Sequence, residues 1–159
     1  NELPHENTEV WLCDISLDAL DVARANIAGI GRNAPNVRVA EGSWCAALPR
    51  ELAGSFQVVV SNPPYIDAAD PLVEESVRMW EPHIALFSAN QGLSDILGIA
   101  QEALEFLVPG GFLICEIGFQ QASVVRAEFA QLGYVNVEVR QDFAGLDRIV
   151  IGQRATSVE

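Results

Sequence analysis

Short hydrophobic runs alternate along the chain with longer stretches in which hydrophobic residues recur at helical spacing. The runs predict buried strands, and the first of them, EVWLC at residues 9–13, is followed by a predicted helix over residues 16–31. Ser16 or Asp18 can cap this helix, and Gly29 and Gly31 would end it. Further strands are predicted at residues 37–40, 56–60, 112–117, 134–140 and 148–152, and further helices at residues 93–107 and 120–132.

The order of these elements predicts the fold class. Strands alternate with helices over the first two thirds of the chain, and two strands follow one another at its end. This order favours a single α/β domain over residues 1–159, with a mostly parallel sheet, helices on both faces and a C-terminal antiparallel hairpin. Residues 67–91 show little periodicity and predict a long loop that is functional or disordered. The sequence VPGG at residues 108–111 predicts a turn before the next strand.

Composition narrows the class of protein further. The chain has 159 residues, 50% of them hydrophobic. It has 22 acidic residues, nine arginines and no lysine, so its formal net charge is −13. An acidic surface repels phosphate backbones, so nucleic acid is an unfavourable partner. No hydrophobic run has the length of a membrane span. Cys13, Cys45 and Cys115 are dispersed, which favours the reducing cytoplasm and predicts no metal site.

Ligands in open α/β sheets bind beyond the carboxyl ends of the strands, and Asp14 stands at the end of the first predicted strand. A carboxylate at such a position in a nucleotide-binding unit accepts hydrogen bonds from ribose hydroxyls. An aspartate there can instead cap the following helix, and the position taken alone favours capping. Both roles stay open for Asp14 on these grounds.

The second polar strand end is the stretch Asn62-Pro63-Pro64-Tyr65, which directly follows three valines. Proline fixes φ and has no N–H, so the two prolines hold an extended backbone whose carbonyl groups point in set directions. The side-chain oxygen of Asn62 adds another acceptor, and Tyr65 supplies a flat face. Acceptors held together in this way suit a planar NH2 group, either an amide or the exocyclic amine of a base. A stiff, polar corner that merely ends the strand is the simpler explanation, and the full pattern favours the functional one.

The stretch at residues 62–65 resembles the signature of methyltransferases that use S-adenosylmethionine and act on planar NH2 groups. Enzymes for glutamine amides and for adenine amino groups share it, so it does not fix the substrate. Four other segments resemble the HemK/PrmC family: VRMWEPHIAL at residues 77–86, QGLSDI at residues 91–96, VPGGFLICEIG at residues 108–118 and DFAGLDRIVIG at residues 142–152. The resemblance runs from about residue 10 to residue 154.

This resemblance implies a Rossmann-like, class I S-adenosylmethionine-dependent methyltransferase fold. It also implies an activity, because the family methylates the amide nitrogen of the glutamine in the Gly-Gly-Gln motif of peptide chain release factors. S-adenosylmethionine is then the cofactor, and release factors are the protein partners. The implied cofactor-binding residues are Asp14, Ser43, Trp44 and Asn62, although a tryptophan after a short strand is also often part of the core.

The resemblance further assigns Asn62, Pro63, Pro64 and Tyr65 to catalysis and to binding of the substrate amide. Arg78 and Glu81 would help to shape the release-factor pocket, or they would form an ion pair that orders the loop. Ser43 departs from the family, which usually has an aspartate at this position. The family's first strand, its glycine-rich loop and its N-terminal helical domain are expected before residue 1, so the chain resembles a truncated catalytic domain.

Two other functions remain as alternatives. An adenine-amino methyltransferase acting on DNA or RNA would use the same loop for a base flipped from its stack, but the net charge of −13 opposes it. A chain without the glycine-rich loop could also be a non-catalytic fragment that binds a partner.

Overall fold

The structure is a computed structural model that describes residues 8–30, 34, 36–67, 69 and 82–156. The chain divides into two compact units, Asn1–Leu52 and Ala53–Glu159. In the first unit, β1 (Val10–Asp14), α1 (Leu17–Ile30) and β2 (Val37–Glu41) are followed by the 3-10 helices η3 (Trp44–Ala47) and η4 (Arg50–Leu52). This unit therefore has the strand–helix–strand order that the sequence predicts.

The two strands of the first unit pair in parallel, with Val10 opposite Val37 and Asp14 opposite Glu41. Ser16 caps α1, because its Oγ accepts a hydrogen bond of 3.3 Å from the backbone N–H of Ala19. Leu20 is 1% exposed and anchors the helix. The predicted helix and its Ser16 cap are thus confirmed.

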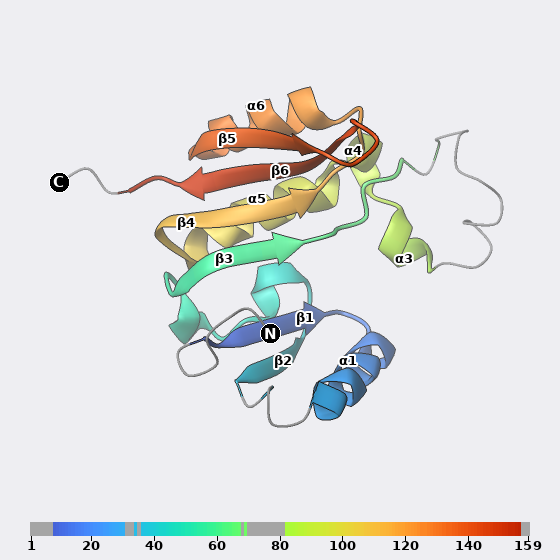
Figure 1. Ribbon diagram of the computed structural model, residues 1–159, viewed down its shortest axis with the longest axis vertical. Helices are drawn as coiled ribbons and strands as arrows, with labels where there is room; N and C mark the ends of the chain where they lie inside the picture. The colour runs from blue at the N-terminus through green and yellow to red at the C-terminus, as the bar shows by residue number, and fades with distance from the viewer. Residues whose placement is uncertain (1–7, 31–33, 35, 68, 70–81, 157–159) are drawn as a thin grey trace. The chain divides into compact units, whose positions relative to one another are not determined.

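The second unit contains a four-stranded sheet in the order β3 (Phe56–Ser61), β4 (Leu107–Glu116), β6 (Asp147–Arg154) and β5 (Tyr134–Gln141) (Figure 1). β3 and β4 are parallel, whereas β6 is antiparallel to both β4 and β5. The predicted C-terminal antiparallel hairpin is confirmed. The sheet of this unit is mixed, and its one parallel pair carries the candidate loop.

Two helices, α5 (Ser94–Phe106) and α6 (Ala122–Leu132), pack against each other and lie on the same face of this sheet (Figure 1). α6 ends at Gly133, which has a φ of 100° and is the predicted stop. The sequence predicts helices on both faces, but within this unit both long helices cover one face. Their fully buried side chains recur at helical spacing: Ile96, Ile99, Ala100 and Ala103 from α5, and Val125 and Phe129 from α6.

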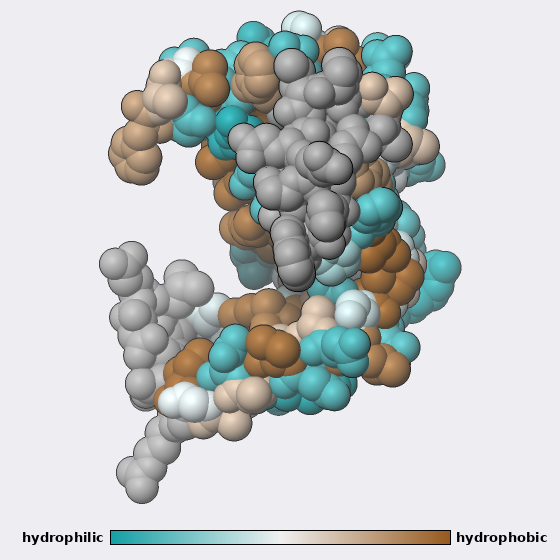
Figure 2. All heavy atoms as spheres, turned by 90° about the vertical axis from the view of Figure 1, so that its right-hand side faces the viewer, coloured by the Kyte–Doolittle hydropathy of each residue, from teal (hydrophilic) through white to brown (hydrophobic). Residues whose placement is uncertain are grey.

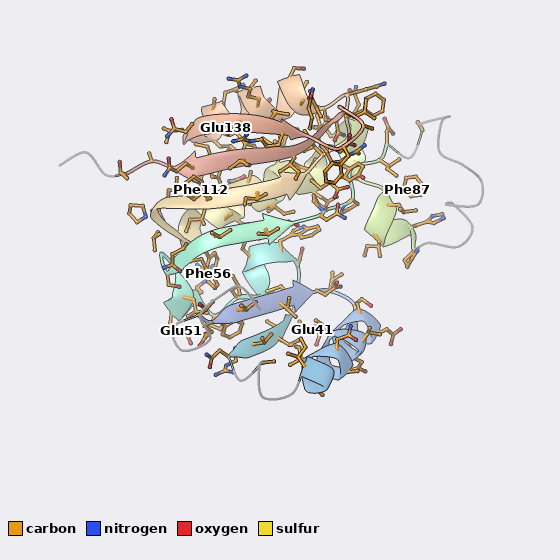
Figure 3. The ribbon with its side chains drawn as sticks, in the orientation of Figure 1. Glu41, Glu51, Phe56, Phe87, Phe112 and Glu138 are labelled. Atoms are coloured by element: carbon orange, nitrogen blue, oxygen red, sulfur yellow. The ribbon has the colours of Figure 1, made fainter. Side chains whose placement is uncertain are left out.

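The opposite face of the sheet is apolar and more open. Leu113 and Cys115 of β4 are 0% exposed and point toward the helices. Because side chains alternate along a strand, their neighbour Phe112 points to the other face, as does its partner Val58. Phe112 is 39% exposed and Val58 is 47% exposed. Figure 3 labels Phe112 on β4.

The predicted turn at residues 108–111 is wrong as a separate element, because these residues belong to β4. Phe56 pairs with Leu107, and the next registered pair joins Val58 to Phe112, so the extra residues of β4 form an irregularity in the pairing. Gly110 accommodates it with a φ of 82°. Proline and glycine signal a bend correctly here, but the bend lies within a strand.

Candidate functional site

The Asn62–Tyr65 loop leaves the carboxyl end of β3, as the sequence predicts. Pro63 is fully buried and Pro64 is buried, whereas Asn62 is exposed. Among the residues that the structure describes, none forms a hydrogen bond with the Asn62 side chain. The buried prolines therefore anchor the loop. Within the described residues, the donors and acceptor of the Asn62 side-chain amide remain available to bind a ligand.

Tyr65 is tied to the neighbouring strand through its hydroxyl. That hydroxyl donates a hydrogen bond of 2.9 Å to Oε1 of Glu116, the last residue of β4. Burial raises the pKa of Tyr65, and the hydrogen bond and negative charge of Glu116 raise it further, while Arg148 lowers it. The phenol consequently stays neutral at ordinary pH and acts as a donor.

The sequence alone does not mark Glu116 as a site residue, because the predicted strand at residues 112–117 places it one residue before the strand end. In the structure β4 ends at Glu116, and ligands bind at the carboxyl ends of such strands. Figure 2 views the molecule from the side toward which β3 and β4 run in Figure 1, and hydrophobic and hydrophilic residues are interspersed among the atoms that it colours.

The backbone beyond Tyr65 is also held in place. The N–H of Ile66 donates to the carbonyl of Leu86 at 3.1 Å, and the N–H of Ser88 donates to the carbonyl of Ile66 at 2.9 Å. These bonds form a parallel bridge between Ile66 and Phe87, which follows the short helix α3 (His83–Leu86) (Figure 3). The segment predicted as a loop therefore contains short elements that support the Asn62–Tyr65 loop.

A third contact comes from the start of α6. Nε2 of Gln121 donates a hydrogen bond of 2.9 Å to the carbonyl of Tyr65. Tyr65 is thus held at its hydroxyl by Glu116 and at its carbonyl by Gln121. No sequence signal marked Gln121, because its partner lies 56 positions away.

In the first unit, the exposed Asp14 ends β1. Its Oδ1 accepts a hydrogen bond of 2.8 Å from the N–H of Ser16, so the carboxylate does support the start of α1. Its carbonyl accepts a hydrogen bond of 3.0 Å from the N–H of Gly42. Glu41, labelled in Figure 3, lies opposite Asp14 at the end of β2.

The bond between Asp14 and Gly42 brings Ser43 and Trp44 to the same end of the β1–β2 pair. Ser43 is exposed and makes no side-chain capping bond to η3, although it precedes that helix. Trp44 is partly buried and has a φ of 48°, an unusual backbone conformation for a bulky residue. A carboxylate, a hydroxyl and an aromatic ring thus gather in this unit, and these groups suit the ribose and base of a nucleoside.

The structure therefore groups Asp14 with Ser43 and Trp44 in the first unit, and Asn62, Pro63, Pro64 and Tyr65 in the second. Arg78 and Glu81 lie outside the described residues. Within the described ranges, no three histidine, cysteine, aspartate or glutamate side chains form a group that could hold a metal ion. None of the helices in this part of the chain combines the length and hydropathy of a membrane span.

Comparison with known proteins identifies the relatives of the chain. No protein-family model matches it. Proteins named release factor glutamine methyltransferase are 41% identical over 140 residues in Aliivibrio fischeri, covering 88% of this chain and 48% of that protein, and 37% identical over 159 residues in Vibrio cholerae, covering 100% and 54%. Over nearly all of its own length, the chain is similar to proteins that carry this name. It spans about half the length of these curated relatives.

Solved structures confirm the fold class. A methyltransferase from Pyrococcus furiosus superposes with a TM-score of 0.66 at 20% identity, covering 94% of this chain and 64% of that one. A SAM-dependent O-methyltransferase from Thermotoga maritima gives a TM-score of 0.65 at 9% identity, covering 96% and 52%. The chain has the class I S-adenosylmethionine-dependent methyltransferase fold, with mixed α/β structure and a C-terminal antiparallel hairpin.

Proposed function

We propose that the chain acts in a methyltransferase that modifies the glutamine side-chain amide in the Gly-Gly-Gln motif of peptide chain release factors. The methyl donor is S-adenosylmethionine, and release factors are the protein partners. Identities of 34–42% to proteins named release factor glutamine methyltransferase carry the proposal. The proposed compartment is the cytoplasm, which the dispersed positions of Cys13, Cys45 and Cys115 in the sequence support.

The proposed substrate loop suits the chemistry of an amide. An amide nitrogen is a poor nucleophile because its lone pair is delocalised into the carbonyl group, and S-adenosylmethionine supplies an electrophilic methyl group when bound. The side-chain oxygen of Asn62 and the carbonyl of Pro63 accept hydrogen bonds from the NH2 group. Since Pro63 is fully buried, its carbonyl has a fixed position, and fixed acceptors stabilise positive charge that develops on nitrogen.

Tyr65 forms a wall of the proposed substrate pocket. Its hydroxyl already donates a hydrogen bond to Glu116, which holds the ring in place. Arg78 and Glu81, outside the described residues, are proposed to shape the release-factor pocket. The proposal excludes nucleic acid as the substrate, in line with the net charge of −13.

The first unit supplies the proposed contacts to the cofactor. The carboxylate of Asp14 accepts hydrogen bonds from the ribose hydroxyls, and Ser43 and Trp44 lie beside the adenine. Asn62 is likewise proposed as a cofactor-binding residue. Ser43 offers a neutral hydroxyl where the family usually has a carboxylate, so its hydrogen bond to the adenine amino group lacks the added strength of a charge.

Two measurements test this proposal. Calorimetric titration of S-adenosylmethionine into the chain should show saturable one-to-one binding. Radiolabelled methyl transfer should then occur to a release factor and not to a release factor whose Gly-Gly-Gln glutamine is replaced by alanine. Methylation of an adenine-containing duplex instead would favour the adenine-amino alternative. A folded chain that binds no cofactor would favour the non-catalytic one.

A further inference from the structure

The side chain of Gln121 joins three segments that are far apart in the sequence. Its Oε1 accepts a hydrogen bond of 2.9 Å from the N–H of Gly118, which lies beyond the end of β4 at Glu116. Its Nε2 donates to the carbonyl of Tyr65 at 2.9 Å and to the carbonyl of Gln91 at 3.1 Å. The oxygen and the nitrogen of this amide are both engaged, so the side chain has a single defined orientation.

The segment that contains Gln91 has an unusual backbone. In α4 (Ala89–Gly92), Asn90 and Gln91 have φ values of 55° and 57°, and Gly92 has a φ of 80°. Left-handed conformations cost about 1–3 kcal/mol for a non-glycine residue and persist only where the surroundings hold them. The hydrogen bond from Gln121 to Gln91 is one such restraint.

This left-handed turn at Asn90–Gly92 packs closely against the Asn62–Tyr65 loop. A Cβ atom placed on Gly92 would lie 2.0 Å from the carbonyl oxygen of Tyr65 and 2.7 Å from Nε2 of Gln121. Only glycine permits this approach, which leaves the Tyr65 carbonyl between the turn and the Gln121 amide. The position of Tyr65 therefore depends on the turn and on Gln121 together.

We propose that Gln121 is a positioning residue for methyl transfer, which holds the Asn62–Tyr65 loop by clamping the Tyr65 carbonyl against the Asn90–Gly92 turn. The inference rests on the proposed function and extends it to a residue that does not touch the reacting atoms. Tyr65 is fixed at its hydroxyl by Glu116 and at its carbonyl by Gln121. Because Asn62 and Pro63 precede Tyr65 in the same loop, the orientation of their acceptor oxygens is restrained as well. Misplacing reacting groups by about 1 Å can lower a rate about 100-fold.

The test compares Gln121→Glu with wild type and with the matched control Gln120→Ala. Glutamate has nearly the same shape and retains an oxygen for Gly118, but it replaces the donor that faces two carbonyl groups with an acceptor. Gln120 is exposed and adjacent, so its replacement controls for a change near the start of α6. Gln121→Ala, which removes all three contacts, serves as the second variant.

In Gln121→Glu, we expect kcat to fall about 10- to 100-fold while KM for S-adenosylmethionine stays within about twofold. Amide hydrogen exchange should accelerate at Ile66 and Ser88, the two bridge donors beside Tyr65, with little change in Tm. Gln120→Ala should match wild type in all of these measurements. A loss of fold alone would lower kcat and cofactor binding together, so the split between kcat and KM separates positioning from stability.

Hydrogen exchange tests the clamp whether or not methyl transfer is detected. If wild type transfers no methyl group to a release factor, the proposed function fails. If amide exchange at Ile66 and Ser88 is as slow in Gln121→Glu as in wild type, the clamp is overturned as well. If wild type is active, equal kcat in wild type and Gln121→Glu would overturn the positioning role while the proposed function stands. Accelerated exchange together with the selective fall in kcat supports the inference.

Discussion

The hydroxyl of Tyr65 donates a hydrogen bond of 2.9 Å to Glu116, a residue 51 positions later in the chain. The bond is possible because β3 and β4 are parallel neighbours, with Ser61 opposite Cys115, so both strands end at one edge. It links the aromatic residue of the candidate loop to a carboxylate, which, together with burial of the phenol, raises the pKa of Tyr65. The pKa of Tyr65 can therefore be measured to test whether this contact of the candidate loop is present.

Glu116→Gln should lower the pKa of Tyr65 toward its ordinary value. Burial remains in this variant, but the carboxylate charge that opposes ionisation of the phenol is removed. The absorbance of tyrosinate gives the titration, and the chain has only two tyrosines. A Tyr134→Phe background isolates Tyr65, and an unchanged titration in that background would show that Glu116 does not act on Tyr65.

The raised pKa of Tyr65 also gives stability a defined dependence on pH. The folded chain holds the phenol proton more tightly than the unfolded chain, so this contribution is complete below the ordinary pKa of about 10. It is lost as the pH rises through the raised pKa of the folded state. Urea unfolding between about pH 8 and pH 11 should show a decline that is smaller in Tyr65→Phe than in wild type.

Asn62→Ala should lower methyl transfer about 100- to 1,000-fold, because loss of one preorganised hydrogen-bonding group has an effect of this size. Affinity for S-adenosylmethionine should change only modestly. Single-turnover transfer to a release factor and calorimetry measure the two quantities. Asn26→Ala, at an exposed position in α1, is the matched control and should behave as wild type. Equal turnover in Asn62→Ala and wild type would remove Asn62 from the mechanism.

Local signals in the sequence predicted the helices and hairpin well. Ser16 and Gly133 mark the start of α1 and the end of α6, and both act through neighbouring backbone groups. The pattern of buried residues in α5 follows from its hydrophobic spacing alone. The polar ends of β1 and β3 were likewise found from the order of residues.

Contacts between distant residues could not be read in this way. Glu116 and Gln121 reach Tyr65 only because β4 lies beside β3 and α6 begins near the end of β4. The left-handed turn at Asn90 and Gln91 was also missed, because neither residue type requires a positive φ. The irregularity in β4 cannot be told from a turn in the sequence, because proline and glycine mark a bend without showing whether strand pairing continues.

Asp14→Asn should weaken binding of S-adenosylmethionine about 10-fold or more, because neutral acceptors form weaker hydrogen bonds than a carboxylate does. The amide oxygen of asparagine can still accept the hydrogen bond from Ser16, so α1 should keep its start. Calorimetry measures the affinity, and circular dichroism measures the helix. Asp18→Asn, also near the start of α1, is the control and should leave the affinity unchanged. Equal loss in both variants would point to damage to the helix instead of a ribose contact.

Gly92→Ala and Gly98→Ala should have opposite effects on stability. At Gly92, a Cβ would lie 2.0 Å from the Tyr65 carbonyl oxygen and the φ of 80° disfavours any side chain, so the free energy of unfolding should fall by at least about 1–3 kcal/mol. At Gly98, inside α5, a Cβ would meet nothing within 4 Å, and alanine should raise the free energy of unfolding by about 0.5–1 kcal/mol. Urea unfolding of both variants checks the signs. If Gly92→Ala is as stable as wild type, the turn does not press on Tyr65. If it is destabilised and also shows rapid amide exchange at Ile66, the loss of stability is located at the candidate loop.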